Sequence, residues 1–169
     1  SAGCRFESYA AHPIQDEAGP LEGPAFPLSP PAEVAVTASP TLRTGIWLFS
    51  DAPADRLVAA IELADRAGID EVWVADEGVS REPVPVLGWA AATTARVALG
   101  VGITSPLLRH PGALGSTIST LDELSGGRAR LGLGIGGSLS LDPFGITYER
   151  PVAVVRDAIR IARAVIERR

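Results

Sequence analysis

A two-part pattern repeats four times between Thr44 and Arg169 and limits the folds that this chain can adopt. Each repeat opens with a short apolar run and continues into a longer segment whose apolar residues recur every three or four positions. The short runs predict buried strands, and the longer segments predict amphipathic helices. The predicted strands cover residues 44–49, 71–76, 97–103 and 128–135, and the predicted helices cover 54–67, 83–95, 111–124 and 151–169.

Strands that alternate with helices form a parallel sheet through right-handed crossovers, which makes this an α/β protein. The four units of residues 44–169 take about 31 residues each, and an eight-unit barrel of about 250 residues has the same average. We therefore predict a fold of the (β/α)8 TIM-barrel type, of which this chain carries about the first four βα units.

A glycine motif raises a second possibility, a doubly wound dinucleotide-binding fold. Gly132, Gly134 and Gly137 form a G-x-G-x-x-G pattern. In a dinucleotide fingerprint the third glycine lies in the first turn of a helix, whose N-terminus faces the pyrophosphate. Here Pro143 and Gly145 follow, so no helix is predicted directly after the motif, and the motif falls on the fourth strand rather than the first. The barrel is therefore the favoured prediction.

Residues 1–43 differ in composition from the rest of the chain. Five prolines are spaced so that neither a helix nor a central strand can run through them: Pro20, Pro24, Pro27, Pro30 and Pro31. We interpret residues 1–43 as a Pro-rich arm or linker and residues 44–169 as the N-terminal half of the barrel. The arm is either a loose tail or a segment that wraps over a partner surface.

Composition argues against several classes of function. A formal net charge of −5, with arginines and acidic residues dispersed, leaves no basic face for nucleic acid. The single cysteine and two distant histidines form neither a disulfide nor a metal site, so we expect no bound metal. No stretch of about 20 apolar residues predicts a membrane span. We expect a cytoplasmic protein that binds a small molecule.

In parallel α/β folds the functional site lies beyond the carboxyl ends of the strands. Asp76 and Glu77 follow the second predicted strand and are the acidic pair in such a position. Because burial raises the pKa of a carboxyl group toward neutrality, the pair is a candidate acid and base. Alternatively, Asp76 only caps the following loop and Glu77 is solvated. His110 precedes Pro111 at a predicted helix start, which favours a structural role, and Arg109 either pairs with an acid or binds a phosphate.

A resemblance to a known family is carried by three segments: "EVWVADE" at 71–77, "TTARVALGVGITSPLLRHPGALGSTISTLDELSGGRARLGLGIGGS" at 93–138 and "FGITYERPVAVVRDAIRIARAVI" at 144–166. The chain resembles the luciferase-like monooxygenase superfamily, most closely its coenzyme F420-dependent branch, which includes methylenetetrahydromethanopterin reductase. The resemblance implies a TIM barrel that holds a deazaflavin (F420) or FMN at the carboxyl ends of its strands. It also implies hydride transfer to or from an organic substrate.

The resemblance further implies roles for individual residues. Asp76, with Glu77 beside it, matches the acidic residue that lies near the ring and the substrate. Gly102 and Ile103 match a bulged third strand that often has a cis peptide bond behind the ring. Thr104 and Ser105 are positioned to hydrogen-bond the cofactor. At the end of the fourth strand, missing side chains let the ring or its tail approach, and the implied cofactor-binding residues there are Gly134, Gly136 and Gly137.

Three functions are compatible with these residues. The first is an F420-dependent oxidoreductase, with this chain as a half-barrel subunit or fragment. The second is an FMN-dependent monooxygenase, which the sequence "TSP" after the third strand disfavours. The third is a non-catalytic structural or interaction subunit, because Glu77 stands where many family members have His and Gly137 where many have an acidic residue.

A half-barrel leaves two sheet edges unpaired and one face of each strand bare. We therefore expect something to cover them: a second half-barrel chain, another copy of this chain in a homo-oligomer, or further residues of the same polypeptide beyond this sequence. Activity as an oxidoreductase is expected to need that second half-barrel.

Overall fold

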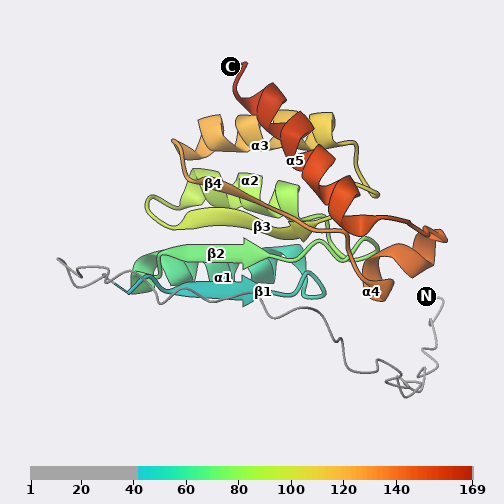
Figure 1. The fold of residues 1–169 in the computed structure, drawn as a ribbon. Coiled ribbons are helices and arrows are strands. Elements are labelled where there is room, and N and C mark those ends of the chain that lie inside the picture. The colour runs from blue at the N-terminus through green and yellow to red at the C-terminus, as the bar shows by residue number, and fades with distance from the viewer. Residues whose placement is uncertain (1–41, 169) are drawn as a thin grey trace, which may run out of the picture. The chain divides into compact units, whose positions relative to one another are not determined.

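The computed structural model describes residues 42–168, so the predicted arm at residues 1–43 lies almost wholly outside the described residues. Within them the predicted order of strands and helices is confirmed (Figure 1). The strands are β1 (Gly45–Leu48), β2 (Glu71–Val74), β3 (Ala98–Thr104) and β4 (Ala129–Leu133). The long helices that follow them are α1 (Ala54–Ala67), α2 (Pro83–Thr93), α3 (Pro111–Ser125) and α5 (Pro151–Ile166).

The four strands form one sheet in the order β1-β2-β3-β4, and every neighbouring pair is parallel. A doubly wound dinucleotide-binding fold places its first strand inside the sheet, between the second and the fourth. Here β1 lies at one edge and β4 at the other, so the chain always crosses over in the same direction. This singly wound order is that of a TIM barrel, and the doubly wound alternative is wrong.

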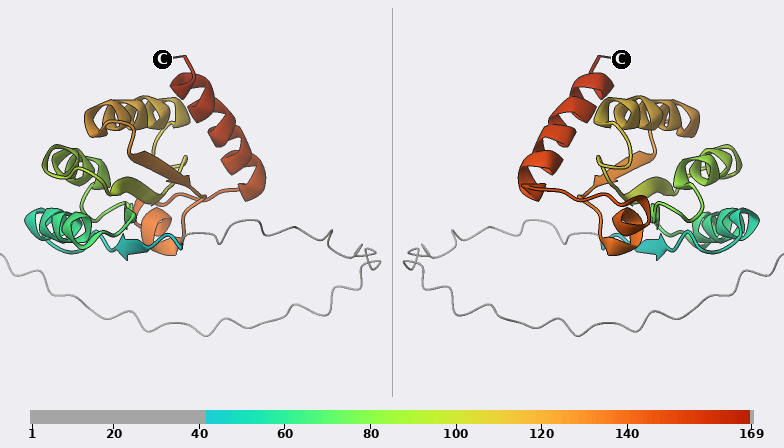
Figure 2. Two further views of the ribbon diagram at one scale, coloured as in Figure 1. Left: turned by 90° about the vertical axis from the view of Figure 1, so that its left-hand side faces the viewer. Right: turned by 90° about the vertical axis from the view of Figure 1, so that its right-hand side faces the viewer.

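The helices α1, α2, α3 and α5 lie round the outer side of the curved sheet (Figure 2). The core fills the layer between the first three of them and the strands. Ile61 from α1, Leu87 from α2 and Leu121 from α3 belong to one cluster with the strand residues Val72 and Leu99, and each is at most 1% exposed. Burying an aliphatic side chain of this size stabilises a fold by about 1.5 to 3 kcal/mol. This one-sided core is half of a (β/α)8 barrel.

Both ends of α3 are capped by residues that are typical of helix ends. Gly126 adopts the left-handed region, with a φ of 67°, where the helix ends, and glycine does so without the steric cost of a Cβ atom. At the start, His110 Nδ1 accepts the N–H of Gly112 at 3.1 Å, and Pro111 follows in the first turn. The structural role predicted for His110 is confirmed.

One short helix differs from the prediction. α4 (Ser138–Leu141) follows the glycine motif directly, and a single 3₁₀ turn, η1 (Asp142–Phe144), continues it. The expectation that no helix follows Gly137 is therefore wrong. The Gly137 carbonyl accepts the N–H of Leu141, four residues on, at 3.0 Å, and this bond closes one α-helical turn. Pro143 limits the helix to this length, because it offers no N–H for a further turn.

Asp65, near the end of α1, holds the segment that leads into β3. Its carboxylate accepts the backbone N–H groups of Ala95, Arg96 and Val97 at 3.2, 2.8 and 2.8 Å. Desolvation raises the pKa of this carboxyl group. The three N–H groups and the charge of Arg128 outweigh that effect and hold the pKa of Asp65 below its usual value.

We expect Asp65→Asn to lower the free energy of unfolding by about 1 to 3 kcal/mol at neutral pH, because the amide is a weaker acceptor for these N–H groups. Since the folded pKa is depressed, the contribution of Asp65 is present above its unfolded pKa of about 3.9 and is lost as the pH falls through the folded value. Urea denaturation of both proteins from neutral to acid pH measures this. A difference between them that does not shrink toward acid pH would contradict the account.

Candidate functional site

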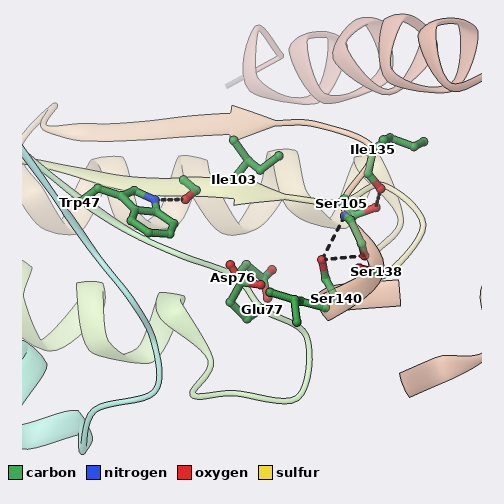
Figure 3. A pocket seen from close by; sticks show the side chains of 12 residues that line it. Trp47, Asp76, Glu77, Ile103, Ser105, Ile135, Ser138 and Ser140 are labelled. Atoms are coloured by element: carbon green, nitrogen blue, oxygen red, sulfur yellow. Dashed lines mark hydrogen bonds between the residues drawn. The ribbon is translucent and has the colours of Figure 1, made fainter. Parts of the chain in front are cut away.

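A pocket of about 430 Å³ opens at the carboxyl ends of the strands. Its walls come from the end of β1, the loops after β2 and β3, and the segment from β4 into α4 (Figure 3). A volume of this size is typical of a small-molecule site. Seven of the nine residues predicted for the site line it: Asp76, Glu77, Gly102, Ile103, Ser105, Gly136 and Gly137.

The other two predicted residues lie just behind the pocket wall. Thr104 is 1% exposed, and its hydroxyl donates to Asp76 Oδ2 at 2.7 Å. Gly134 lies beneath the side chain of Ile103, because a Cβ atom added at Gly134 would collide with Ile103 Cδ1. In this structure the missing side chain at Gly134 therefore makes room for Ile103.

Asp76 is the buried acid of the site. It follows β2, is 7% exposed and lines the pocket, and its carboxylate oxygens interact with groups on the side away from the pocket. Besides the Thr104 hydroxyl, the Arg109 guanidinium lies 3.4 Å from Oδ2, and the N–H of Gly78 lies 3.4 Å from Oδ1. The two interpretations of Asp76 therefore hold together: it caps the loop that follows β2, and it faces the pocket.

Arg109 pairs with two acids. Its guanidinium binds Glu82 as well as Asp76, and so joins the loop after β3 to the start of α2, where Glu82 is the N-cap. The hydrogen bond to Glu82, together with the charge of Asp76, raises the pKa of Arg109 above its usual value. Of the two roles predicted for Arg109, pairing with an acid is confirmed.

The floor of the pocket is the end of β3. The peptide bond between Gly102 and Ile103 is cis, as the resemblance implies. The indole N–H of Trp47, on β1, donates to the carbonyl oxygen of Gly102. Phe49 packs edge-on against this indole, with 4.6 Å between the ring centroids. Trp47 is thereby fixed as an aromatic wall beside the floor.

Hydroxyl groups and a glycine turn form the opposite side of the pocket. The Ser105 hydroxyl donates to the carbonyl oxygen of Ile135 at 2.6 Å, so its proton is used within the protein. Gly136 has a φ of 91°, a region that favours glycine, and turns the chain toward α4. Ser140 Oγ accepts the N–H of Gly137 at 3.3 Å, which holds α4 against the end of this turn.

Five lining residues are not among those predicted: Trp47, Ile135, Ser138, Leu139 and Ser140. Trp47 belongs to the first predicted strand, where the period of two places it on the face opposite Ile46 and Leu48. That alternation is the signal that could have found it. The residues of α4 carry no comparable signal, because their place in the site depends on how the chain folds back over the strand ends.

The described part of the chain contains no cluster of three or more His, Cys, Asp or Glu residues that could hold a metal ion. Among the same residues, no helix is long and apolar enough to cross a membrane. The carboxyl groups that line the pocket are those of Asp76 and Glu77, adjacent in the chain and side by side in Figure 3.

We expect Thr104→Val to lower the free energy of unfolding by about 1 to 2 kcal/mol, because the isosteric valine leaves the buried Asp76 carboxylate without its 2.7 Å donor. Chemical denaturation measures the change. Thr120→Val is the matched control, since Thr120 donates from an exposed position on α3 to its own helix, and its effect should be below about 0.5 kcal/mol. An equal fall in the free energy of unfolding in both variants would contradict the prediction that the buried hydrogen bond to Asp76 stabilises the fold more than the exposed one.

Comparisons with known proteins point the same way as this geometry. The family model described as luciferase-like monooxygenase matches residues 33–169. The 5,10-methylenetetrahydromethanopterin reductase of Archaeoglobus fulgidus is 34% identical over 126 residues, a match that covers 75% of this chain and 38% of that protein. The F420-dependent glucose-6-phosphate dehydrogenase of Beutenbergia cavernae is 38% identical over 126 residues, covering 68% of this chain and 37% of that protein.

Among solved structures, the coenzyme F420 dependent tetrahydromethanopterin reductase from Methanopyrus kandleri matches with a TM-score of 0.65 and 34% identity. The match covers 73% of this chain and 39% of that one. The chain thus spans 37% to 39% of the length of these relatives. The family match over residues 33–169, the singly wound sheet and the pocket at the strand ends agree, and the chain belongs to the luciferase-like monooxygenase family.

Proposed function

We propose that this chain is part of an F420-dependent oxidoreductase, which transfers a hydride between a deazaflavin and an organic substrate. The observation that carries the proposal is the pocket where Asp76, the cis peptide of Gly102 and Ile103, and the turn at Gly136 and Gly137 meet. The relatives whose names specify F420, at 38% and 34% identity, support this cofactor over FMN.

The residues of the pocket fit a flat tricyclic ring. The backbone of Gly102 and the indole of Trp47 form two adjoining surfaces that bring no charged group. At Gly137 an added Cβ atom would meet no atom within 4 Å, so this edge of the pocket has room for a ring. The exposed Ser138, which carries a hydroxyl group, lines the rim beside it, where the polar edge of a ring would need a partner.

A bound deazaflavin would supply or accept the hydride, and the chain's own residues would position the reactants. Asp76 holds or moves a proton at its carboxyl oxygens, because it lines the pocket while Thr104 and Arg109 fix it from behind. Glu77, partly exposed beside it, orients a polar group of the substrate. Ile103 and Trp47 present apolar surface to a bound ring at the floor of the pocket.

The barrel of this proposal is completed by further strands. A TIM barrel closes with eight βα units, and the described residues supply four strands. We propose that the active form contains a second half-barrel, provided by further residues of the same polypeptide, by a second chain or by another copy of this one. That half would supply the rest of the substrate pocket.

Cofactor binding tests the proposal. The full chain is purified from a host that makes F420, its absorbance and fluorescence are recorded, and it is then titrated with F420 and with FMN. Copurified F420, with tighter binding of F420 than of FMN, is the expected result. A preference for FMN would replace the proposal with the monooxygenase alternative. Binding of neither would overturn it in favour of a non-catalytic structural subunit.

A further inference from the structure

A second hollow, of about 290 Å³, lies on the other side of Asp76 from the pocket at the strand ends. Asp76 lines both spaces, so it belongs to the wall between them. Arg109, from the loop after β3, lines this rear hollow, and its side chain is 31% exposed. The guanidinium of Arg109 therefore has space in which to move toward Asp76 or away from it.

Arg109 is shared unequally between two acids. Its Nη2 atom donates a hydrogen bond to Glu82 Oε2 but lies 3.4 Å from Asp76 Oδ2. A hydrogen bond between a guanidinium and a carboxylate is usually about 2.7 to 2.9 Å long. The short bond to Asp76 Oδ2 comes instead from the neutral hydroxyl of Thr104, at 2.7 Å. Asp76 is thus held closely by a neutral donor, while the cation beside it is bound by Glu82.

The two carboxylate oxygens of Glu82 have different partners. Oε1 accepts the N–H of Val84 at 3.3 Å and so caps α2, while Oε2 binds Arg109. The side chain of Glu82 is 39% exposed and lines neither hollow, whereas the side chain of Asp76 is 4% exposed. Glu82 is therefore connected to the pocket through Arg109 rather than by a contact of its own.

We propose that Glu82 is a positioning residue for Asp76: by binding Arg109, it keeps the guanidinium out of full hydrogen-bond contact with Asp76, so that Asp76 can both take up and release a proton. A guanidinium in direct contact with an aspartate strongly favours the charged form of the acid. An acid held in that form is a poor proton carrier. This role of Glu82 rests on the proposed function, which assigns the proton to Asp76, but its pairing with Arg109 needs no cofactor.

The other charged groups near Asp76 come from its own loop and from the segment that covers it. Glu77, the next residue, is partly exposed and lines the same pocket. Helix α4 carries no charged side chain, and Asp142 of η1 is exposed. These groups stay the same when Glu82 or Arg109 is replaced. A change in the titration of Asp76 on such a replacement therefore reports on the pair of Glu82 and Arg109.

Carbon-13 NMR of the full chain, labelled at the aspartate carboxyl carbons, tests the proposal, and the signal of Asp76 is assigned by its loss in Asp76→Asn. In Glu82→Gln the amide oxygen can still accept the N–H that caps α2, but Arg109 loses its charged partner and turns to Asp76. The signal should then titrate about one pH unit or more below its position in the wild type. Arg109→Gln removes the cation, so there the signal should titrate at a higher pH than in the wild type.

Glu167→Gln is the matched control, because it removes one exposed carboxylate at the C-cap of α5 and should leave the titration of Asp76 unchanged. If the Asp76 signal of Glu82→Gln titrates as in the wild type, or at a higher pH, Arg109 does not turn to Asp76 and the proposal is overturned. F420 binding is measured on the same samples. Opposite shifts in a chain that binds no F420 would support the role of Glu82 in holding Arg109 and overturn the proposed function. F420 binding without these shifts would do the reverse.

Discussion

Arg128→Met is expected to lower the free energy of unfolding by about 3 to 5 kcal/mol, a large part of the stability of an ordinary domain. The guanidinium has five N–H donors, and all five are used. Nε donates to the carbonyl of Ser125 at 2.6 Å, Nη1 to Thr94 Oγ1 and the carbonyl of Val97 at 2.9 Å, and Nη2 to the carbonyls of Ala91 and Thr94 at 3.0 Å.

These bonds tie the ends of α2 and α3 to the start of β3. Methionine keeps most of the side-chain volume but donates to none of these acceptors, so the carbonyls at the helix ends lose their partners. Urea denaturation followed by circular dichroism measures the loss. Arg130→Met, on β4 two residues after Arg128, is the matched control, because Arg130 donates only to the neighbouring Ala129 carbonyl among the bonds of its side chain seen here. We expect it to lower the free energy of unfolding by less than about 1 kcal/mol. Similar losses in both variants would contradict this role of Arg128.

Gly137→Leu is expected to lower the affinity for F420 by about a hundredfold while the melting temperature stays within about 2 °C of the wild type. Gly137 lines the pocket, its backbone is extended, with a φ of −118°, and an added Cβ atom would meet nothing within 4 Å. The first atom of a leucine side chain therefore has space in the protein. The side chain then takes space that the proposed cofactor needs.

Fluorescence titration with F420 and thermal unfolding of the same samples measure both effects. Gly88→Leu is the matched control, because Gly88 also has no atom within 4 Å of an added Cβ but lies on α2, outside the pocket. It should leave the affinity unchanged. Undiminished binding by Gly137→Leu would mean that the cofactor does not occupy this part of the pocket.

The fold could be predicted because its determinants are local. The apolar runs and helical periodicities of residues 44–169 mark each strand and helix, and Gly126 and Pro111 mark the ends of α3 within one or two positions. The short helix α4 could not be predicted in this way. A single turn is too short to show a periodicity, and it is held by a bond between Gly137 and Ser140.

The site could be predicted in part. Positions after the strands are recognisable from the chain alone, which led to Asp76, and the resemblance added the cis peptide at Gly102 and Ile103. Gly134 was expected to leave bare backbone beside the ring. In the structure the space next to Gly134 is filled by the side chain of Ile103. Trp47 was not predicted. The strand alternation indicates which face of β1 it lies on, but its bond to Gly102, 55 positions away, is seen only in the structure.

Local patterns in the sequence were enough to predict the order of the elements, the barrel-type fold and the acid that follows β2, because periodicity, caps and strand ends are properties of neighbouring residues. Three further features are seen only in the folded chain: Arg109 binds Asp76 and Glu82, the Thr104 hydroxyl donates to Asp76, and α4 folds over the strand ends. Each of these depends on side chains or segments that come together through the parallel sheet. The distances between loops that are far apart in the sequence are set by tertiary packing, and no local sequence pattern predicts them.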